Sequence, residues 1–474
     1  MSNWNVPLYN AVMRYSNSAP VAFHMPGHKL GKGIPEELLK NPALLDVTEI
    51  PGTDNLHFPE GPIKEAQDLA AQVFFADKTY FLVNGSTGGI HSMMMAVCRP
   101  GDKLIVGRDC HKSVIGGMML GGIKPVYVKP EYESDFGVPS VISPEKLEEA
   151  LRQNPDAAGV LITRPNYYGI CSDIEEIARI VHAHGKILMV DEAHGAHLGF
   201  HHRLPVCAMQ AGADICVQSA HKTLPAFTQG AYLHVKSPRV DVDRLEFYLR
   251  TLQTSSPSYV LMAFLDIARE IMAQRGKELM ERLLGHIDWF KAAVEEDGRM
   301  DFLDAVTAGR GRLDNTRLVV HMKRAKVTGF ETERLLREHF NIQVEMSDYY
   351  NVVCIATTAD RREDFEKLRR ALGEVCRRSE DNPPLDRMGF MGWDIPEIKI
   401  ELKDIMKYKG VKVKLCDSVG KTSLEMVTPY PPGIPALCPG ETISARTVEH
   451  IKRIADLGGI VNGLSSQREI RVVE

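Results

Sequence analysis

The chain has 474 residues, of which 44% are hydrophobic, 25% are charged and 7% are aromatic, and its formal charge at pH 7 is −5. This composition is typical of a soluble globular protein, and the length predicts two or three domains. The acidic balance argues against a nucleic-acid partner, which usually requires a basic excess. The longest apolar run, 259–268, contains Asp266 and is too short to span a bilayer, so no membrane partner is expected.

The cysteines and the first residues predict a cytoplasmic protein. There are nine cysteines, an odd number, and no two have the CxxC spacing. Most lie in apolar surroundings, which is typical of thiols that act as small buried hydrophobic side chains in a reducing compartment. The first residues lack the basic and apolar segments of a secretory signal.

Short apolar runs alternate with helical patterns over the first two-thirds of the chain. The predicted strands are 79–83, 103–106, 125–128, 159–163, 186–191, 214–219 and 230–235. The helices predicted between them include 88–97 and two that begin with capping residues, Ser143 and Ser172, the second ending at Gly185. Near-continuous apolar strands alternating with helices predict an α/β domain, with a mostly parallel sheet covered by helices on both faces.

The last third of the chain has a different pattern of predicted strands and helices. A helical pattern over 259–296 is followed by predicted strands at 317–322, 341–346 and 351–357, with helices around 331–339, 361–376 and 443–457. This mixture predicts a second, smaller α+β C-terminal domain. The expected division is an N-terminal arm (1–26), a major domain (27–290) and the C-terminal domain (291–474).

The first candidate functional segment is VNGSTGGIH, residues 83–91. A strand enters a turn rich in Gly, Ser and Thr that opens a helix, so backbone N–H groups and hydroxyls can bind an anion, most often phosphate. The segment is neither a P-loop nor a GxGxxG fingerprint. A plain strand–helix turn is the alternative.

The second segment is LMVDEAHGAHLGF, residues 188–200, in which Asp191 ends a predicted strand. Ligands of parallel sheets gather at this edge, and a buried carboxylate there needs a cationic or hydrogen-bonding partner. Capping of the following loop is the alternative role for Asp191. His194, His197, His201 and His202 suggest a metal, but their irregular spacing and the lack of an HExxH motif lead us to expect none.

The third segment, residues 214–235, places Lys222 directly after a predicted strand, beside Ser219, His221 and Thr223. Burying an ammonium group is costly, so a lysine here suits an imine-forming amine with a lowered pKa. A surface lysine in a turn is the alternative. In combination, a phosphate turn, an acidic strand end and a Ser-x-His-Lys strand end match the needs of pyridoxal 5'-phosphate.

With these segments the sequence resembles the Orn/Lys/Arg decarboxylase family, among the fold type I (aspartate-aminotransferase-like) pyridoxal-phosphate enzymes. The resemblance extends over almost the whole chain. It includes the motifs FHMPGHKLG (23–31), TDNLHFPEGPIKEAQDLAA (53–71), DCHKSV (109–114), QTSSPSY (253–259) and TPYPPGIPALCPGE (428–441). The length resembles the short form typical of Gram-positive bacteria, without the N-terminal wing domain of the longer enterobacterial enzymes.

The resemblance implies a role for each residue of the predicted site. Lys222 would bind the cofactor aldehyde, and Asp191 would pair with the pyridine nitrogen. Other implied cofactor contacts are the phosphate ligands Ser86, Thr87, Ser219 and His221, the ring-stacking His111 and, near the ring hydroxyl, His194. A capping histidine is the alternative for His111, and an ordinary loop hydrogen bond is the alternative for His194. The segment 23–29 would lie close to the active site.

The resemblance also implies a homodimer with the active site at the interface. Thr254 and Ser255 resemble residues that reach the phosphate of the neighbouring subunit, an ordinary helix cap being the alternative.

The implied reaction is decarboxylation of a basic amino acid, with arginine favoured as substrate and agmatine, for polyamine synthesis, as product. Lysine (giving cadaverine) and ornithine (giving putrescine) are the alternatives. A basic substrate needs an acidic group at the far end of its pocket. Candidates by residue type alone are Asp54, Glu60, Asp348 and Glu441. The proton donor to the α-carbon would be Lys222 or a nearby histidine.

Two other classes of function compete with this interpretation. One is a different fold type I reaction: transamination, β-elimination or an acyl-CoA condensation, since DEAH also occurs in the condensing enzymes. The motifs DCHKS, HMPGHK and PYPPGIP favour the decarboxylases instead. The other is a non-catalytic relative, against which the intact Lys222, Asp191 and phosphate turn argue.

Overall fold

A computed structural model of the chain describes residues 6–304, 311–385, 395–430 and 433–474, with a seven-stranded sheet as its largest element. The sheet order is β2-β11-β10-β9-β7-β3-β4. Its strands are β2 (Lys78–Leu82), β3 (Lys103–Gly107), β4 (Lys124–Val128), β7 (Gly159–Thr163), β9 (Ile187–Asp191), β10 (Ile215–Gln218) and β11 (Ala231–Val235). Six of these strands run in the same direction, and β11 runs in the opposite direction between β2 and β10. The predicted mostly parallel sheet is confirmed.

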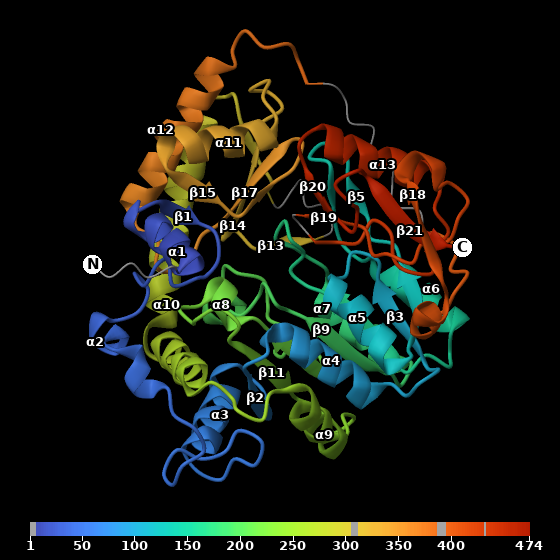
Figure 1. The fold of residues 1–474 in the computed structure, drawn as a ribbon. Helices are drawn as coiled ribbons and strands as arrows, with labels where there is room; N and C mark the ends of the chain where they lie inside the picture. Colours follow the sequence, from blue (N-terminus) through green and yellow to red (C-terminus); the bar gives the residue numbers. More distant parts are fainter. Residues whose placement is uncertain (1–5, 305–310, 386–394, 431–432) are drawn as a thin grey trace.

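Helices cover both faces of this sheet (Figure 1). One face packs against α4 (Gly85–Val97), α5 (Lys112–Gly121) and α9 (Val242–Leu252). The other packs against α6 (Pro144–Gln153), α7 (Ile174–Ala183), α3 (Pro62–Val73) and α10 (Tyr259–Glu295). Within β7, Leu161 belongs to the first layer of the core, whereas Val160 and Ile162 belong to the second. This alternation explains why the strands are apolar throughout.

The two predicted helix caps have different outcomes. Ser143 caps α6 as predicted, its Oγ accepting the N–H of Lys146 at 3.3 Å. The prediction for Ser172 is wrong, because Asp173 caps α7 while the buried Ser172 Oγ accepts the N–H of Ile142 at 3.0 Å. Ser172 instead binds the loop before α6, and the carboxylate of the next residue, Asp173, caps the helix.

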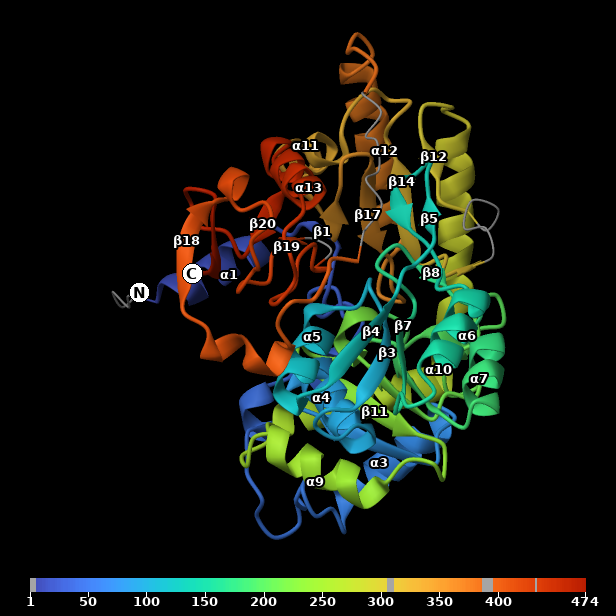
Figure 2. The same cartoon turned by 90° about the vertical axis from the view of Figure 1, so that its right-hand side faces the viewer.

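The long helix α10 connects the large sheet to a smaller four-stranded sheet (Figures 1 and 2). The smaller sheet has the order β12-β14-β17-β16 and packs with α11 (Gly329–Phe340) and α12 (Arg362–Arg378). Its strands are β12 (Asp301–Phe302), β14 (Arg317–His321), β16 (Met346–Ser347) and β17 (Asn351–Ile355). The predicted strand 341–346 is interrupted. Its first part, β15 (Ile342–Val344), leaves this sheet and pairs in parallel with β1 (Val21–Phe23).

The C-terminal residues form a unit with its own apolar core. It contains β18 (Gly410–Lys414), β19 (Thr428–Tyr430), β20 (Ile460–Asn462), β21 (Glu469–Val473) and α13 (Ala445–Asp456). Arg108 and Glu441 join this unit to the loop after β3 through a buried ion pair of 3.1 Å. A smaller C-terminal domain is therefore present, whereas the exact boundaries 1–26, 27–290 and 291–474 stay a prediction.

Apart from the N-terminal helix α1, the remaining elements are short. They are α1 (Pro7–Asn17), α2 (Glu36–Leu39), α8 (Ala220–Thr223), β5 (Tyr132–Glu133), β6 (Val138–Pro139), β8 (Ile170–Cys171), β13 (Arg312–Leu313), and the 3-10 helices η1 (Pro42–Leu45), η2 (Leu198–Phe200), η3 (Leu402–Lys407) and η4 (Leu415–Asp417). Within the described part of the chain, no helix combines the length and apolar character needed to cross a bilayer.

Candidate active site

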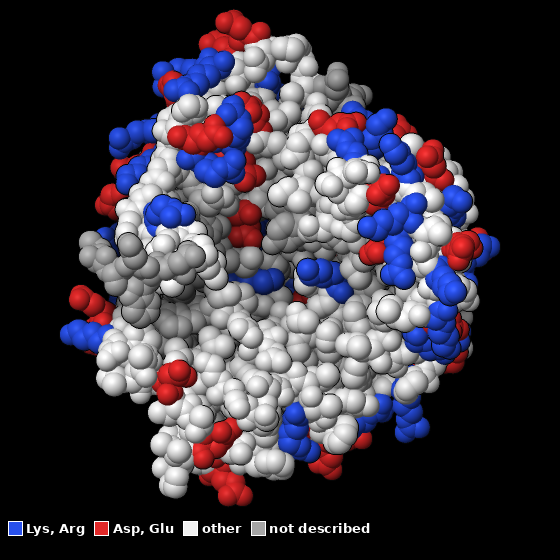
Figure 3. Space-filling model, in the orientation of Figure 1, with Lys and Arg blue, Asp and Glu red and all other residues white. Residues whose placement is uncertain are grey.

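The predicted site residues follow strands that end at the same edge of the large sheet. β2 leads into α4, β3 into the loop before α5, β9 ends at Asp191, and β10 leads into α8. Because β2, β3, β9 and β10 run in one direction, their carboxyl ends meet, as in other open α/β sheets. Figure 3 shows the surface hollowed near its centre, with both basic and acidic side chains in the hollow.

Lys222 lies in the short helix α8 and contacts His194. Its Nζ is 2.9 Å from Nε2 of His194. Burial lowers the pKa of Lys222 to about 8, although the charge of Asp191 acts in the opposite direction. A lysine with this pKa is partly neutral near physiological pH, and the neutral amine is the form that attacks an aldehyde.

Asp191 is the last residue of β9 and is 2% exposed. Burial raises the pKa of its carboxyl, while the positive charge of Lys222 and a hydrogen bond from the N–H of Ala193 lower it. The Ala193 bond, at 3.1 Å, is the loop cap that the sequence left open as an alternative. The charge of Lys222 acts on the same carboxylate, so the two ionisable groups lie near each other.

The start of α4 and Ser219 fit an anion such as the phosphate of pyridoxal phosphate. The helix begins at Gly85 with a φ of +69°, and no side chain caps it. Its first N–H groups are therefore free to bind an anion, next to the half-buried Ser86 and the exposed Thr87. Ser219 is fully buried, and its Oγ has no hydrogen-bond partner within the described residues. Because buried hydroxyl groups are nearly always hydrogen-bonded, this free Oγ is available to bind a ligand.

The two other predicted histidines are neutral at pH 7. Nδ1 of His111 accepts the N–H of Ser113 at 3.3 Å and lies 2.8 Å from its Oγ, so His111 does cap α5. Burial and the charge of Lys222 lower its pKa to about 3. His221 donates from Nδ1 to the carbonyl of Gly230 at 3.1 Å, and burial lowers its pKa to about 4. A neutral imidazole at position 111 can stack on an aromatic ring.

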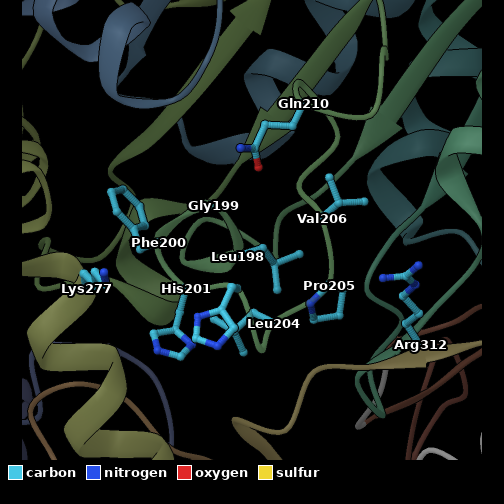
Figure 4. A pocket seen from close by; sticks show the side chains of 11 residues that line it. Leu198, Gly199, Phe200, His201, Leu204, Pro205, Val206, Gln210, Lys277 and Arg312 are labelled. Carbon is cyan, nitrogen blue, oxygen red and sulfur yellow. The ribbon is translucent and has the colours of Figure 1, made fainter.

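The four histidines after β9 do not converge. His194 contacts Lys222, His197 lies 3.1 Å from Asp314, and His201 lies 2.6 Å from Glu281. His201 and His202 line a separate cavity of about 460 Å³ beside η2 (Figure 4). In the described ranges, no group of three or more His, Cys, Asp or Glu side chains could hold a metal ion.

The N-terminal motif FHMPGHK lies against α8. The N–H of Gly27 donates to the carbonyl of His221 at 2.7 Å. A side chain at Gly27 would come within 2.6 Å of the Leu224 carbonyl oxygen, so only glycine fits there. Lys29 is buried and donates to the carbonyls of His24 and Ile355. This loop therefore forms part of the wall around Lys222.

Two residues that sequence reasoning missed also belong to the site. Arg317, the first residue of β14, donates to Nδ1 of His194 at 2.8 Å. Glu345, between β15 and β16, accepts the N–H of Met25 at 3.0 Å. Each is a charged residue beside or within an apolar strand pattern. That charge was the only feature of the local sequence that could have pointed to either residue.

Thr254 and Ser255 are exposed in the single chain. The preceding residue, Gln253, accepts the N–H of Val83 at 2.8 Å, which fixes this segment next to the phosphate turn. Ser258, not Thr254 or Ser255, caps α10. A role toward the neighbouring subunit stays a prediction.

Four acids were candidates for binding the basic end of the substrate, and three of them have structural roles instead. Asp54 accepts the backbone N–H groups of Asn55, Glu60, Gly61 and Ile63. Asp348 accepts hydrogen bonds from Tyr168 and Asn351, and Glu441 pairs with Arg108. The fourth, Glu60, is exposed.

The fold and this site define a class of protein. The chain superposes on the constitutive lysine decarboxylase of Escherichia coli with a TM-score of 0.78, at 20% identity, over 99% of this chain and 82% of that one. It also resembles alanine–glyoxylate aminotransferase from Nostoc sp., with a TM-score of 0.58, at 16% identity, over 75% of this chain and 95% of that one. The likeness shows the fold type I architecture.

The chain belongs to the Orn/Lys/Arg decarboxylase family: the major-domain model of that family matches residues 6–364, and its C-terminal-domain model matches residues 401–464. Arginine decarboxylase from Bacillus subtilis is 36% identical over 100% of this chain and 99% of its own length. Arginine decarboxylase from Bacillus anthracis is 35% identical over 98% and 96%. The protein is a carboxy-lyase of basic amino acids, and its family uses pyridoxal 5'-phosphate, as predicted.

Proposed function

We propose that this enzyme decarboxylates arginine to agmatine, which supplies polyamine synthesis. Two observations support the proposal. The first is that the arginine decarboxylases of two Bacillus species align with nearly the full chain at 35–36% identity. The second, which carries the chemistry, is a lysine of lowered pKa that touches His194 and faces the buried Asp191.

The site residues would hold the cofactor as follows. Lys222 Nζ would bind its aldehyde, the Asp191 carboxylate would keep its ring nitrogen protonated, and the neutral His111 would stack on the ring. Ser86, Thr87, Ser219 and His221 would bind its phosphate, and His194 would lie near its ring hydroxyl. When bound, pyridoxal phosphate accepts the electron pair released as carbon dioxide leaves.

Lys222 and His194 also act in delivering the proton that replaces carbon dioxide on the α-carbon. In its protonated form, Lys222 Nζ would be an acid within the site that can supply this proton. His194 Nε2–H, 2.9 Å away, donates to the neutral amine and so positions Nζ before it takes up the proton. We therefore assign the proton donor to Lys222 and a positioning role to His194.

The working form proposed here is a cytoplasmic homodimer. The N-terminal helix α1 has no buried residue, and Leu8, Tyr9 and Val12 on it are more than half exposed, which is an apolar surface of the kind that subunit contacts cover. In the dimer Thr254 and Ser255 would reach the partner's phosphate. All nine cysteines are free and eight of them are buried, which suits a reducing compartment.

The proposal is tested by carbon dioxide release and product identification on cofactor-loaded protein. Arginine, lysine and ornithine are given separately at matched concentrations. Agmatine as the dominant product supports the proposal. Cadaverine or putrescine would replace arginine with lysine or ornithine as the substrate, and absence of any amine would return the reaction to another fold type I class.

A further inference from the structure

The cavity beside η2 is a concave site apart from the one around Lys222. Its volume of about 460 Å³ is typical of sites that bind small molecules. Lys277 of α10 and Arg312 of β13 line it together with residues of the loop 198–210 (Figure 4). None of the described residues that line it is among those expected to hold pyridoxal phosphate. A ligand of this cavity would therefore bind away from the reacting atoms.

Packing holds the two cationic residues of the cavity on separate walls. The helix α10 lies close against η2, since a side chain at Gly276 would come within 2.8 Å of Phe200. Arg312 belongs to β13, which pairs with β8 and places Arg312 opposite Cys171. Figure 4 shows Lys277 and Arg312 on opposite sides of the cavity. Their positive charges therefore face the same space from two directions.

Neither cation is neutralised within the described part of the chain. Lys277 and Arg312 form no hydrogen bond or ion pair with any residue described there. Glu281, one turn further along α10 from Lys277, is bound to His201 instead, at 2.6 Å. No Asp or Glu is among the described residues that line the cavity. The cavity is therefore positively charged, which attracts anions and repels the cationic amines that the enzyme's own reaction produces.

The wall between the two cations is apolar. Leu198, Leu204 and Pro205 lie there, between Lys277 and Arg312 in Figure 4. An aliphatic chain placed against these side chains would be removed from water, which is favourable. A guanidinium or ammonium group binds a carboxylate through charge-assisted hydrogen bonds. An apolar wall with a cation at each side therefore matches a carbon chain that has a carboxylate at each end.

We propose that this cavity binds an aliphatic dicarboxylate, with one carboxylate on Lys277 and the other on Arg312. Gln210 can add a neutral hydrogen bond: its Oε1 accepts the thiol of Cys207 at 3.2 Å, which leaves its amide N–H groups to donate to the ligand. A ligand with a single carboxylate would satisfy only one of the two cations. The inference is independent of the proposed function, because it involves none of the residues assigned to the reaction.

The test compares diacids with a monoacid. Succinate, glutarate and adipate are titrated into the cofactor-loaded protein by saturation-transfer NMR, with pentanoate as the ligand that has one carboxylate. The diacid that binds most tightly should exceed pentanoate about tenfold in affinity, and Lys277→Gln and Arg312→Gln should each remove about that factor, as expected for one charge-assisted hydrogen bond. Both residues are exposed, and circular dichroism checks that each variant keeps the fold.

Arg275→Gln is the matched control. It removes the same charge from an exposed position on α10 that pairs with Glu278 and does not line the cavity. Diacid binding that exceeds pentanoate binding, and that falls in Lys277→Gln and Arg312→Gln but not in the control, supports the inference.

Three results would overturn the inference. The first is equal binding of pentanoate and all three diacids. The second is diacid binding that Lys277→Gln and Arg312→Gln both retain, because the ligand would then bind elsewhere. The third is an equal loss in Arg275→Gln, because net charge alone would then attract the ligand. Turnover of arginine plays no part in this test, so a failure of the proposed function leaves its outcome unchanged.

Discussion

Arg317 fixes the orientation of the hydrogen bond between His194 and Lys222. Its guanidinium, on β14 of the smaller sheet, donates to Nδ1 of His194 at 2.8 Å. Since a guanidinium can only donate, Nδ1 must be the acceptor, and the proton of the imidazole is on Nε2. Burial keeps the pKa of His194 well below its ordinary value, so the ring is neutral. Nε2–H therefore donates to the neutral amine of Lys222.

Replacement of Arg317 should release this constraint. Loss of a charged hydrogen-bond donor costs about 1.5–3 kcal/mol, so Arg317→Met should lower kcat about 10- to 100-fold. Arg317→Lys should restore part of the rate. The pH profile of kcat distinguishes this role from a general loss of structure, because the lysine pKa should shift in Arg317→Met. An unchanged pH profile at reduced rate would contradict the positioning role.

Lys222→Ala should abolish both turnover and the visible absorbance of covalently held cofactor, while circular dichroism stays that of the wild type. In the proposed site this lysine captures the aldehyde, and no other lysine contacts His194 in the described structure. Lys32→Ala, at a half-exposed lysine paired with Asp364, provides the control. Catalysis that survives in Lys222→Ala would disprove the assignment of this lysine.

Asp191→Ala should still bind cofactor but lose most of the rate. In the proposed site this carboxylate keeps the pyridine ring protonated, and removing one pre-organised electrostatic partner typically costs about 100- to 1000-fold in kcat. Cofactor content is measured after gel filtration, and kcat is measured on the same sample. A near-normal kcat with full cofactor content would show that Asp191 has no electronic role.

The rate of cofactor capture by the cofactor-free protein should depend on pH. Burial lowers the pKa of Lys222 to about 8, and only the neutral amine attacks the aldehyde. Below that value the neutral fraction, and with it the rate, rises about tenfold per pH unit; above it the rate levels off. Stopped-flow absorbance between pH 6 and 10 measures this dependence. A midpoint near the ordinary lysine pKa would contradict the burial seen around Nζ.

Glu441→Gln should destabilise the protein strongly. Glu441 and Arg108 form a buried pair in which each side chain is 1% exposed. Breaking a buried pair leaves one charge without a partner and costs about 3–5 kcal/mol. Urea unfolding measures the free energy of unfolding. Glu148→Gln, which removes an exposed pair with Arg152, should cost at most about 1 kcal/mol. If both variants lost a similar free energy of unfolding, burial would not be what makes the Arg108–Glu441 pair costly to break.

The sequence predicts those features that depend on local patterns. Strands such as β7 and β9 are short, apolar and bounded by turns. Asp191 ends β9 and Lys222 comes shortly after β10, so both the fold class and these two residues could be identified. Asp173 rather than Ser172 caps α7, because the competing hydrogen bond to Ile142 comes from a distant loop. Arg317 and Glu345 could not be predicted for the same reason. They reach the site only through the packing of one sheet against another.

The pairing of Met25 with Glu345 joins residues 320 positions apart in the chain. The Met25 N–H therefore cannot make this hydrogen bond on the ribosome until about three-quarters of the protein has been synthesised, although Gly27 can bind the His221 carbonyl earlier. Thr357 completes the attachment, donating from its Oγ1 to the Gly27 carbonyl at 2.9 Å. The strands of the large sheet and Lys222 emerge much earlier and can fold first. The contacts of this wall with Glu345 and Thr357 thus form only after most of the chain has been synthesised, so they close around a lysine whose own strand and helix can already be in place.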